Sequence, residues 1–279
     1  MIRYIFLTLL IVSNATAFSL FGSEKATDRT YVEAVRAMKE VVIATQKTRG
    51  LTNNYMNGNV VAQLLVYGER TEMKKAFENL KAICSSIENV PPEYRKRAKA
   101  LMKEAARINK KAFRKKASEV FVVYTKIIEG WIALSTKIVK ERFSQKDPTL
   151  YHALLFQAST LLPLTENIGK MRGMGSGIVA RGECRKEEVP KMLSFAEGIE
   201  KYRVETVKFL KAHPLVSKAQ VEKLNAMLAD YAALTKEKVI GKKKITLDPN
   251  KYFDQGTVCI SEVSKVYDAV SKTIDAALQ

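Results

Sequence analysis

Apolar residues along this chain recur at alternating steps of three and four, the spacing that places them on one face of a helix. One such series lies between residues 118 and 143 and consists of Val120, Tyr124, Ile127, Trp131, Leu134 and Ile138. A second lies between residues 255 and 278 and consists of Ile260, Val263, Tyr267, Val270 and Ile274. Almost no segment has the period of two that a strand requires. The pattern therefore predicts an all-α protein.

Glycine and proline are few and clustered, and they divide the chain into eight expected helices. These helices cover about residues 27–57, 60–90, a stretch from about 91, and then about 118–143, 149–181, 186–212, 218–240 and 255–278. Within the fifth, Pro163 is expected to produce a kink, and Gly182 is expected to end the helix. Residues 241–254 are polar, and we expect a loop there.

Amphipathic helices joined by short turns form up-and-down four-helix bundles. The break at Asp147-Pro148 lies between the fourth and fifth helices. We therefore expect a double helical bundle, in which two up-and-down four-helix bundles share long helices. The expected boundaries are 18–147 for the first bundle and 148–279 for the second, together one domain. The alternative is a coiled-coil oligomer, which the regular breaks disfavour.

The first residues have the features of a secretory signal peptide. Arg3 is positive, residues 5–12 are almost wholly apolar, and Ala15-Thr16-Ala17 is a small-x-small cleavage signal. The alternative, a membrane anchor, needs about 20 apolar residues. We therefore expect residues 1–17 to be removed after Ala17 and the mature protein to be periplasmic or secreted.

The chain is strongly basic, with 47 Lys and Arg against 29 Asp and Glu and a formal net charge of +18. Removing Arg3 with the signal peptide lowers this charge from +18 to +17. Such a charge attracts anions, although export argues against nucleic acid as a partner. The two histidines, His152 and His213, belong to no Glu-x-x-His motif. Without haem, phosphate-loop or nucleophile motifs either, we expect no enzyme, metal or cofactor.

One short segment occurs twice. Lys47-Thr48-Arg49-Gly50-Leu51 recurs 123 residues later as Lys170-Met171-Arg172-Gly173-Met174. In both copies the arginine takes an apolar position in the three-four series of its helix. A charged guanidinium in a helical seam must find acceptors. It can extend to the surface, or pair with a carboxylate such as Glu166.

A third arrangement explains both arginines at once. If their helices face each other, Arg49 and Arg172 converge and repel unless an anion lies between them. A small planar oxyanion fits the guanidinium fork, and the further donors would be the hydroxyls of Thr45, Thr52 and Thr165. Four glycines also lie within the helix that contains Arg172, where each costs about 1 kcal/mol relative to alanine. They are Gly169, Gly173, Gly175 and Gly177, and they indicate close backbone approach.

Three segments resemble the nitrate- and nitrite-sensing (NIT) domain family. They are Gln46-Lys47-Thr48-Arg49-Gly50-Leu51, Pro163 with Glu166-Asn167-Ile168-Gly169-Lys170-Met171-Arg172-Gly173, and Asp248-Pro249-Asn250-Lys251-Tyr252-Phe253-Asp254-Gln255-Gly256-Thr257. The resemblance implies two four-helix bundles that bind nitrate or nitrite between Arg49 and Arg172. The chain departs from the family in having Thr48 where an acidic residue is usual, and we expect no fused output domain. A membrane-bound sensor kinase or chemoreceptor would then receive the signal, and a homodimer would fit.

Two other functions stay open at this point. One is a binding module for another small anion, such as a carboxylate or an amino acid. The other is a non-sensing periplasmic scaffold with a basic face. Among the three cysteines, Cys84 is expected in the core. Cys184 and Cys259 lie near the same end of the expected second bundle, where a disulfide between them is geometrically allowed.

Overall fold

The computed structural model describes the backbone of residues 2–279 and the side chains of residues 27–279. The signal peptide expected over residues 1–17 lies outside the residues whose side chains are described. The helices are α1 (Ile2–Met56), α2 (Ala62–Ser85), α3 (Pro92–Lys111), the 3-10 helix η1 (Ala112–Arg114), α4 (Ala117–Phe143), α5 (Pro148–Phe156), the π-helix η2 (Gln157–Leu161), α6 (Leu162–Arg181), α7 (Val189–Ala212), α8 (Lys218–Lys238) and α9 (Pro249–Ala277). No strand occurs among the described residues, so the all-α expectation is confirmed.

The breaks between helices follow local chemistry. The Asp147 carboxylate accepts the backbone N–H of Leu150, and Pro148 lies in the first turn of α5. This is a favourable helix start because a side-chain oxygen satisfies a free N–H and proline needs none. Gly182 ends α6 with a left-handed φ of 84°, a conformation that glycine adopts without strain. Both breaks lie where the sequence predicted them.

The long helix expected from about residue 149 to 181 is present but not uniform. α5, η2 and α6 follow one another without a gap, so nine α-helices form eight rods in the described part of the chain. Pro163 lies in the first turn of α6, directly after the π-helical turn η2. Proline removes one backbone donor from a helix, and π turns often mark such a site. The irregularity expected at Pro163 therefore takes the form of a π-helical turn.

The last helix begins earlier than expected. We expected residues 241–254 to be a loop, but α9 starts at Pro249. The Asp248 carboxylate accepts the backbone N–H groups of Asn250 and Lys251, which fixes the first turn. The Asp-Pro pair is the same start signal as Asp147-Pro148, and its polar surroundings concealed it. This correction places Tyr252 and Phe253 on a helix rather than in a loop.

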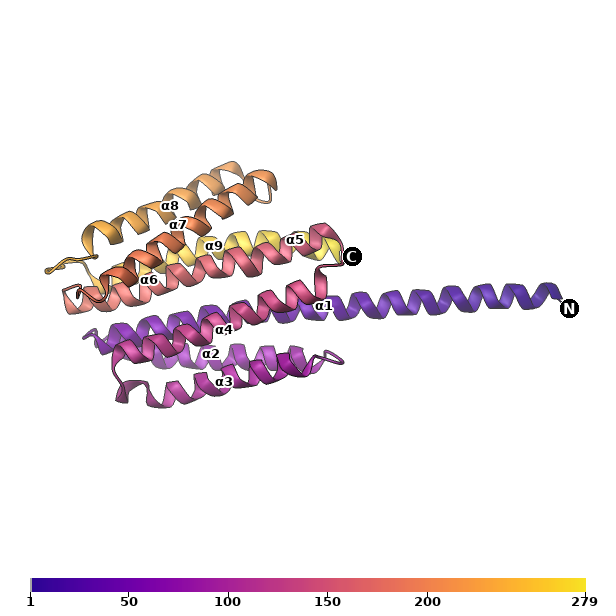
Figure 1. The fold of residues 1–279 in the computed structure, drawn as a ribbon, viewed down its shortest axis with the longest axis horizontal. Helices are drawn as coiled ribbons and strands as arrows, with labels where there is room; N and C mark the ends of the chain where they lie inside the picture. Colours follow the sequence, from indigo (N-terminus) through magenta and orange to yellow (C-terminus); the bar gives the residue numbers. More distant parts are fainter. Residues whose placement is uncertain (1) are drawn as a thin grey trace.

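The helices lie side by side along one long axis (Figure 1). α2 and α4 pack against α1, and α3 packs against α4, whereas α7 and α9 pack against α6, and α8 packs between α7 and α9. α1 and α6 join the two groups, and one apolar core runs through both. The domain boundary expected between residues 147 and 148 stays a prediction. Among the described residues, no helix is long and apolar enough to cross a membrane.

α1 and α6 run in the same direction. Gln46 contacts Glu166, Asn53 donates to the carbonyl oxygen of Gly173, and further along Asn57 accepts from Arg181. Residue numbers thus rise together along the two helices, with an offset close to the 123 residues that separate the two arginine segments. The repeated sequence therefore corresponds to a repeated position in space.

Candidate functional site

Arg49 and Arg172 are buried at corresponding positions of α1 and α6. Their side chains are 0% and 1% exposed, and each precedes a glycine, Gly50 or Gly173. These glycines lie where the two helices approach most closely, because a Cβ built on Gly173 would be 3.0 Å from the Cα of Gly50. That distance is below the usual range for carbon contacts. Neither arginine therefore reaches solvent, which excludes the surface alternative.

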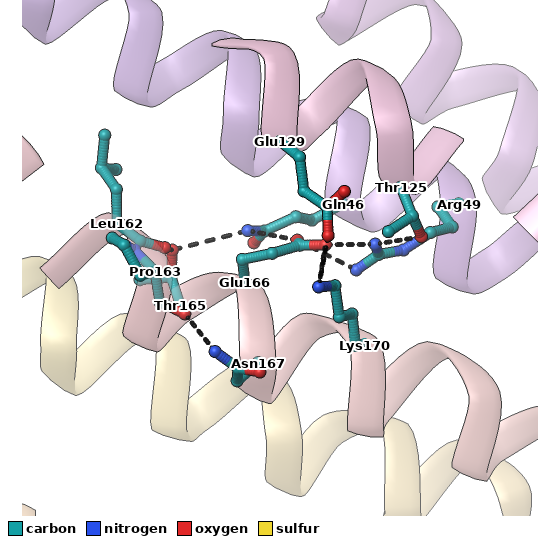
Figure 2. A network of polar contacts seen from close by, with 10 residues as sticks. All are labelled: Gln46, Arg49, Thr125, Glu129, Leu162, Pro163, Thr165, Glu166, Asn167 and Lys170. Atoms are coloured by element: carbon teal, nitrogen blue, oxygen red, sulfur yellow. Dashed lines mark hydrogen bonds and ion pairs between the residues drawn. The ribbon is translucent and has the colours of Figure 1, made fainter. Parts of the chain in front are cut away.

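Arg49 pairs with Thr125 on α4 and Glu166 on α6, and only its Nε has no hydrogen-bond partner among the described residues. Its Nη1 donates to Glu166 Oε1 at 2.6 Å and to Thr125 Oγ1 at 2.9 Å, and its Nη2 donates to Glu166 Oε2 at 3.2 Å (Figure 2). Its guanidinium carbon also lies 4.8 Å from the centre of the Phe121 ring. A two-bond fork to a carboxylate with an aromatic face is a strong arrangement for arginine. The carboxylate alternative is therefore correct for Arg49.

The charges around Glu166 balance. Its Oε2 accepts from Gln46, and its Oε1 lies 4.0 Å from Nζ of Lys170, which pairs with Glu129 at 2.6 Å. Burial, the largest effect, raises the pKa of the Glu166 carboxyl, and Arg49 and Lys170 oppose that rise. The cluster holds two cations and two carboxylates. The cluster is therefore neutral, and it has no unbalanced positive charge that would attract an anion.

Arg172 is partnered much less completely. Its Nη1 donates to Thr257 Oγ1 at 2.8 Å, and its guanidinium carbon lies 4.5 Å from the centre of the Phe253 ring. Its Nε and Nη2 are buried and have no hydrogen-bond partner among the described residues. Burial is the main reason that the pKa of Arg172 falls to about 10, with Arg49 adding repulsion. At neutral pH the group stays protonated, so it is a buried cation without a carboxylate beside it.

Tyr231 and Tyr252 lie near Arg172 in the buried part of the site. A Cβ built on Gly256 would lie 2.7 Å from Tyr231 Oη and 2.8 Å from Arg172 Cβ, so the two side chains meet over this glycine. The Tyr231 hydroxyl is buried without a hydrogen-bond partner in the described chain, whereas the Tyr252 hydroxyl contacts Thr235 at 2.9 Å. Burial raises the pKa of Tyr231 well above its usual value. The Tyr231 hydroxyl therefore stays protonated and is an unused donor beside an unpaired cation.

The three threonines expected to help bind an anion differ in their bonding. Thr45 donates to the carbonyl oxygen of Val41, and Thr165 donates to that of Leu162. Such bonds within a helix use the only hydroxyl hydrogen. Thr52 is buried without a hydrogen-bond partner in the described chain. Thr52 is thus the one of the three whose donor is unused, and ligand roles for all three stay predictions.

The glycines of α6 serve close packing, as expected. A Cβ on Gly175 would lie 2.4 Å from Tyr252 Oη, and one on Gly177 would lie 2.3 Å from Asn53 Nδ2. At Gly169 the Cβ would lie 3.2 Å from Arg49 Nη2. Glycine at these positions of α6 therefore leaves room for neighbouring polar side chains.

A family model described as nitrate and nitrite sensing matches residues 40–275. The chain belongs to the NIT family. The match covers both arginine segments and all the helices that surround them. The description of the family supports a sensing role for the chain.

The fold of this NIT domain is similar to the solved structure of the NasR transcription antiterminator. The TM-score is 0.70 at 14% sequence identity, and the alignment covers 96% of this chain and 74% of that one. At this identity the likeness shows a shared helical fold. No curated protein matches the sequence significantly.

Sequence reasoning did not assign four side chains to contacts with the two arginines. Phe121 and Thr125 on α4 contact Arg49, and Phe253 and Thr257 on α9 contact Arg172. Each pair is a phenylalanine followed four residues later by a threonine, so each pair shares one helical face. The repeated Phe-x-x-x-Thr pattern was a signal in the sequence, but a weak one without the arginines beside it.

The disulfide considered between Cys184 and Cys259 is not formed, because all three cysteines are free thiols. Cys184 follows the end of α6, and its backbone N–H donates to the carbonyl oxygen of Lys242. Cys259 points instead toward α8, with its Sγ 3.9 Å from the carbonyl oxygen of Met227. Helix ends at one end of a bundle need not place their side chains face to face. Cys84, which we expected in the core, is only half-buried.

Proposed function

We propose that this NIT domain binds nitrate or nitrite at Arg172, one of its two buried arginines, while Arg49 is held by Glu166. The observation that carries this proposal is the state of Arg172, a buried guanidinium with two unused donor nitrogens. Leaving a buried cation unpaired is strongly unfavourable. A bound anion would supply the missing charge and accept the unused N–H groups.

The surroundings of Arg172 favour a small planar anion. The guanidinium fork matches two coplanar oxygens, and nitrate and nitrite both present them. Phe253, Gly256 and Tyr231 pack closely around the arginine, which disfavours a bulky ligand. A small carboxylate is the second candidate, because Glu166 already shows a carboxylate in the fork of Arg49.

The test is isothermal titration of the protein with sodium nitrate, sodium nitrite and sodium acetate, with sodium chloride as the control for ionic strength. Arg172→Ala removes two charge-assisted hydrogen bonds, each worth about 1.5–3 kcal/mol. We expect at least about a 100-fold loss of nitrate or nitrite affinity. Arg185→Ala, an exposed arginine near the end of α6, should bind as the wild type does. Equal affinity of Arg172→Ala and wild type would show that the site is elsewhere.

We also propose that the domain acts in the periplasm and signals to a separate membrane protein, such as a sensor kinase or chemoreceptor. The apolar run with Ala15-Thr16-Ala17 supports export, and the family match supports a sensing role. Protein recovered from a periplasmic extract should begin at Phe18 by N-terminal sequencing. Recovery in the cytoplasm with Met1 intact would argue against both the compartment and the membrane partner.

A further inference from the structure

The two arginines lie in two copies of one local structure. The Arg49 half-site consists of Arg49, Phe121 and Thr125, and the Arg172 half-site consists of Arg172, Phe253 and Thr257. In each half-site the guanidinium lies over the phenylalanine ring, at 4.8 and 4.5 Å. In each half-site Nη1 donates to the threonine hydroxyl, at 2.9 and 2.8 Å. The agreement extends to bond type, partner type and distance.

Each half-site also uses the glycine of the other. A Cβ on Gly50 would lie 2.8 Å from Cε2 of Phe253, and a Cβ on Gly173 would lie 3.2 Å from Cε2 of Phe121. Exchanging α1 and α4 with α6 and α9 therefore converts one half-site into the other. This relation makes any remaining difference between them informative.

The difference is one carboxylate. In the Arg49 half-site, Glu166 accepts two hydrogen bonds from the guanidinium. The 123-residue offset of the repeat matches Glu166 to Ile43, which has no charge. Within the described structure, Nε is unpartnered in both arginines, and Arg172 also has an unpartnered Nη2. One half-site is neutral and the other carries an uncompensated positive charge.

Among the described residues, no carboxylate forms an ion pair with Arg172. Glu69 and Glu166 both attract Arg172 at longer range. Glu69, however, pairs with Lys47 at 3.6 Å, and Glu166 pairs with Arg49 at 2.6 Å. Their charges are thus already engaged, and the donors of Arg172 remain open.

We propose that the Glu166 carboxylate fills, in the Arg49 half-site, the position that nitrate or nitrite takes in the Arg172 half-site. The inference rests on the proposed function and deepens it, because it makes Arg172 the receptor for the ligand and Arg49 a half-site closed from within. A carboxylate, nitrate and nitrite each present two coplanar oxygens to the guanidinium fork. One structure can therefore accept the internal or the diffusible anion, and the wild type binds one anion per chain.

The first test moves the ligand from one half-site to the other. Sodium nitrate is titrated calorimetrically into wild type, Arg172→Ala, Glu166→Gln and the double variant Arg172→Ala/Glu166→Gln. We expect one site in wild type, none in Arg172→Ala, and one again in the double variant, because Arg49 is released from its internal partner. The single variant Glu166→Gln should bind two ions. A double variant that binds no nitrate, although its helix content is unchanged, overturns the inference.

The second test removes the closed half-site as a neutral unit. Arg49→Met/Glu166→Gln deletes one positive and one negative charge, a replacement that buried ion pairs often tolerate without loss of stability. Since the Arg172 half-site is then untouched, nitrate affinity should stay within about threefold of wild type. A loss of about tenfold or more would show that the ion is shared between both arginines and overturn the inference.

The two proposals fail in different ways. Wild type that binds neither nitrate nor nitrite refutes the proposed function and the inference with it. Wild type that binds, combined with lost binding in Arg49→Met/Glu166→Gln, leaves the function standing and removes the inference alone. Far-UV circular dichroism and thermal unfolding of every variant, with and without nitrate, verify that lost binding is not lost folding.

Discussion

Replacing Gly173 by alanine tests whether the close approach of α1 and α6 is a structural requirement of the site. The added Cβ would lie 3.0 Å from the Cα of Gly50 and 3.2 Å from Cε2 of Phe121. Carbon atoms prefer separations of about 3.5–4.0 Å, so the two helices must move apart by roughly 0.5–1 Å. Overpacking of this kind costs about 1–3 kcal/mol. Against it stands a gain of about 1 kcal/mol, because alanine favours the helix over glycine.

The matched control is Gly68→Ala in α2. Gly68 is an exposed helical glycine, and a Cβ built on it meets nothing within 4 Å. This variant should therefore show only the propensity gain and become more stable by about 1 kcal/mol. The free energy of unfolding, measured by urea denaturation, should differ between the two variants by about 1–3 kcal/mol. If both alanines stabilise equally, the helices are not in the contact described, and the reasoning on Gly173 is wrong.

Three further predictions concern the charges of the site. Glu166→Ala leaves Arg49 as an unpaired buried cation and should lower the free energy of unfolding by about 3–5 kcal/mol in urea; the exposed Glu129→Ala should cost at most about 1 kcal/mol, and equal effects would contradict the pairing. Tyr231→Phe removes one unused donor beside Arg172, so nitrate affinity should fall about fivefold in calorimetry at unchanged helix content, whereas unchanged affinity would place the ion away from Tyr231. Because the folded-state pKa of Arg172 is lowered only to about 10, the cation persists at neutral pH, and nitrate affinity should be flat up to about pH 9 and then fall; a decline already near neutral pH would implicate another group.

Much of the fold could be predicted from sequence because each helix buries one apolar stripe. The three-four series in α4 and α9 contain residues that are buried in the core, such as Trp131 and Val263. The start of α9 was missed because the polar segment before it has no apolar period, and its signal was the cap at Asp248. Capping acts through single hydrogen bonds, so it leaves only a short local pattern.

The site was predictable in part for a physical reason. Arginine in an apolar helical position is costly enough to be noticed, so Arg49 and Arg172 were found from periodicity together with the repeated segment around them. The fate of each guanidinium depends on residues far away in sequence, such as Glu166 on α6 and Thr257 on α9. Periodicity fixes the face of a helix, but not which neighbouring helix covers that face. The two arginines therefore have different polar partners, which periodicity could not predict, and an anion bound between them stays a prediction.

Under the proposed function, that asymmetry explains how a repeated structure senses one anion. A buried guanidinium needs a negative partner to be stable. Arg49 finds its partner within the chain, so the hydrogen bonds that it makes to α4 and α6 do not depend on the composition of the solution. Under the proposed function, Arg172 takes its partner from solution, so the bonding between α6 and α9 depends on the anion concentration. Under the proposed function, one difference between the repeats, Glu166 against Ile43, distinguishes the two half-sites. The Arg49 half-site keeps its internal carboxylate, and the Arg172 half-site responds to the anion in solution.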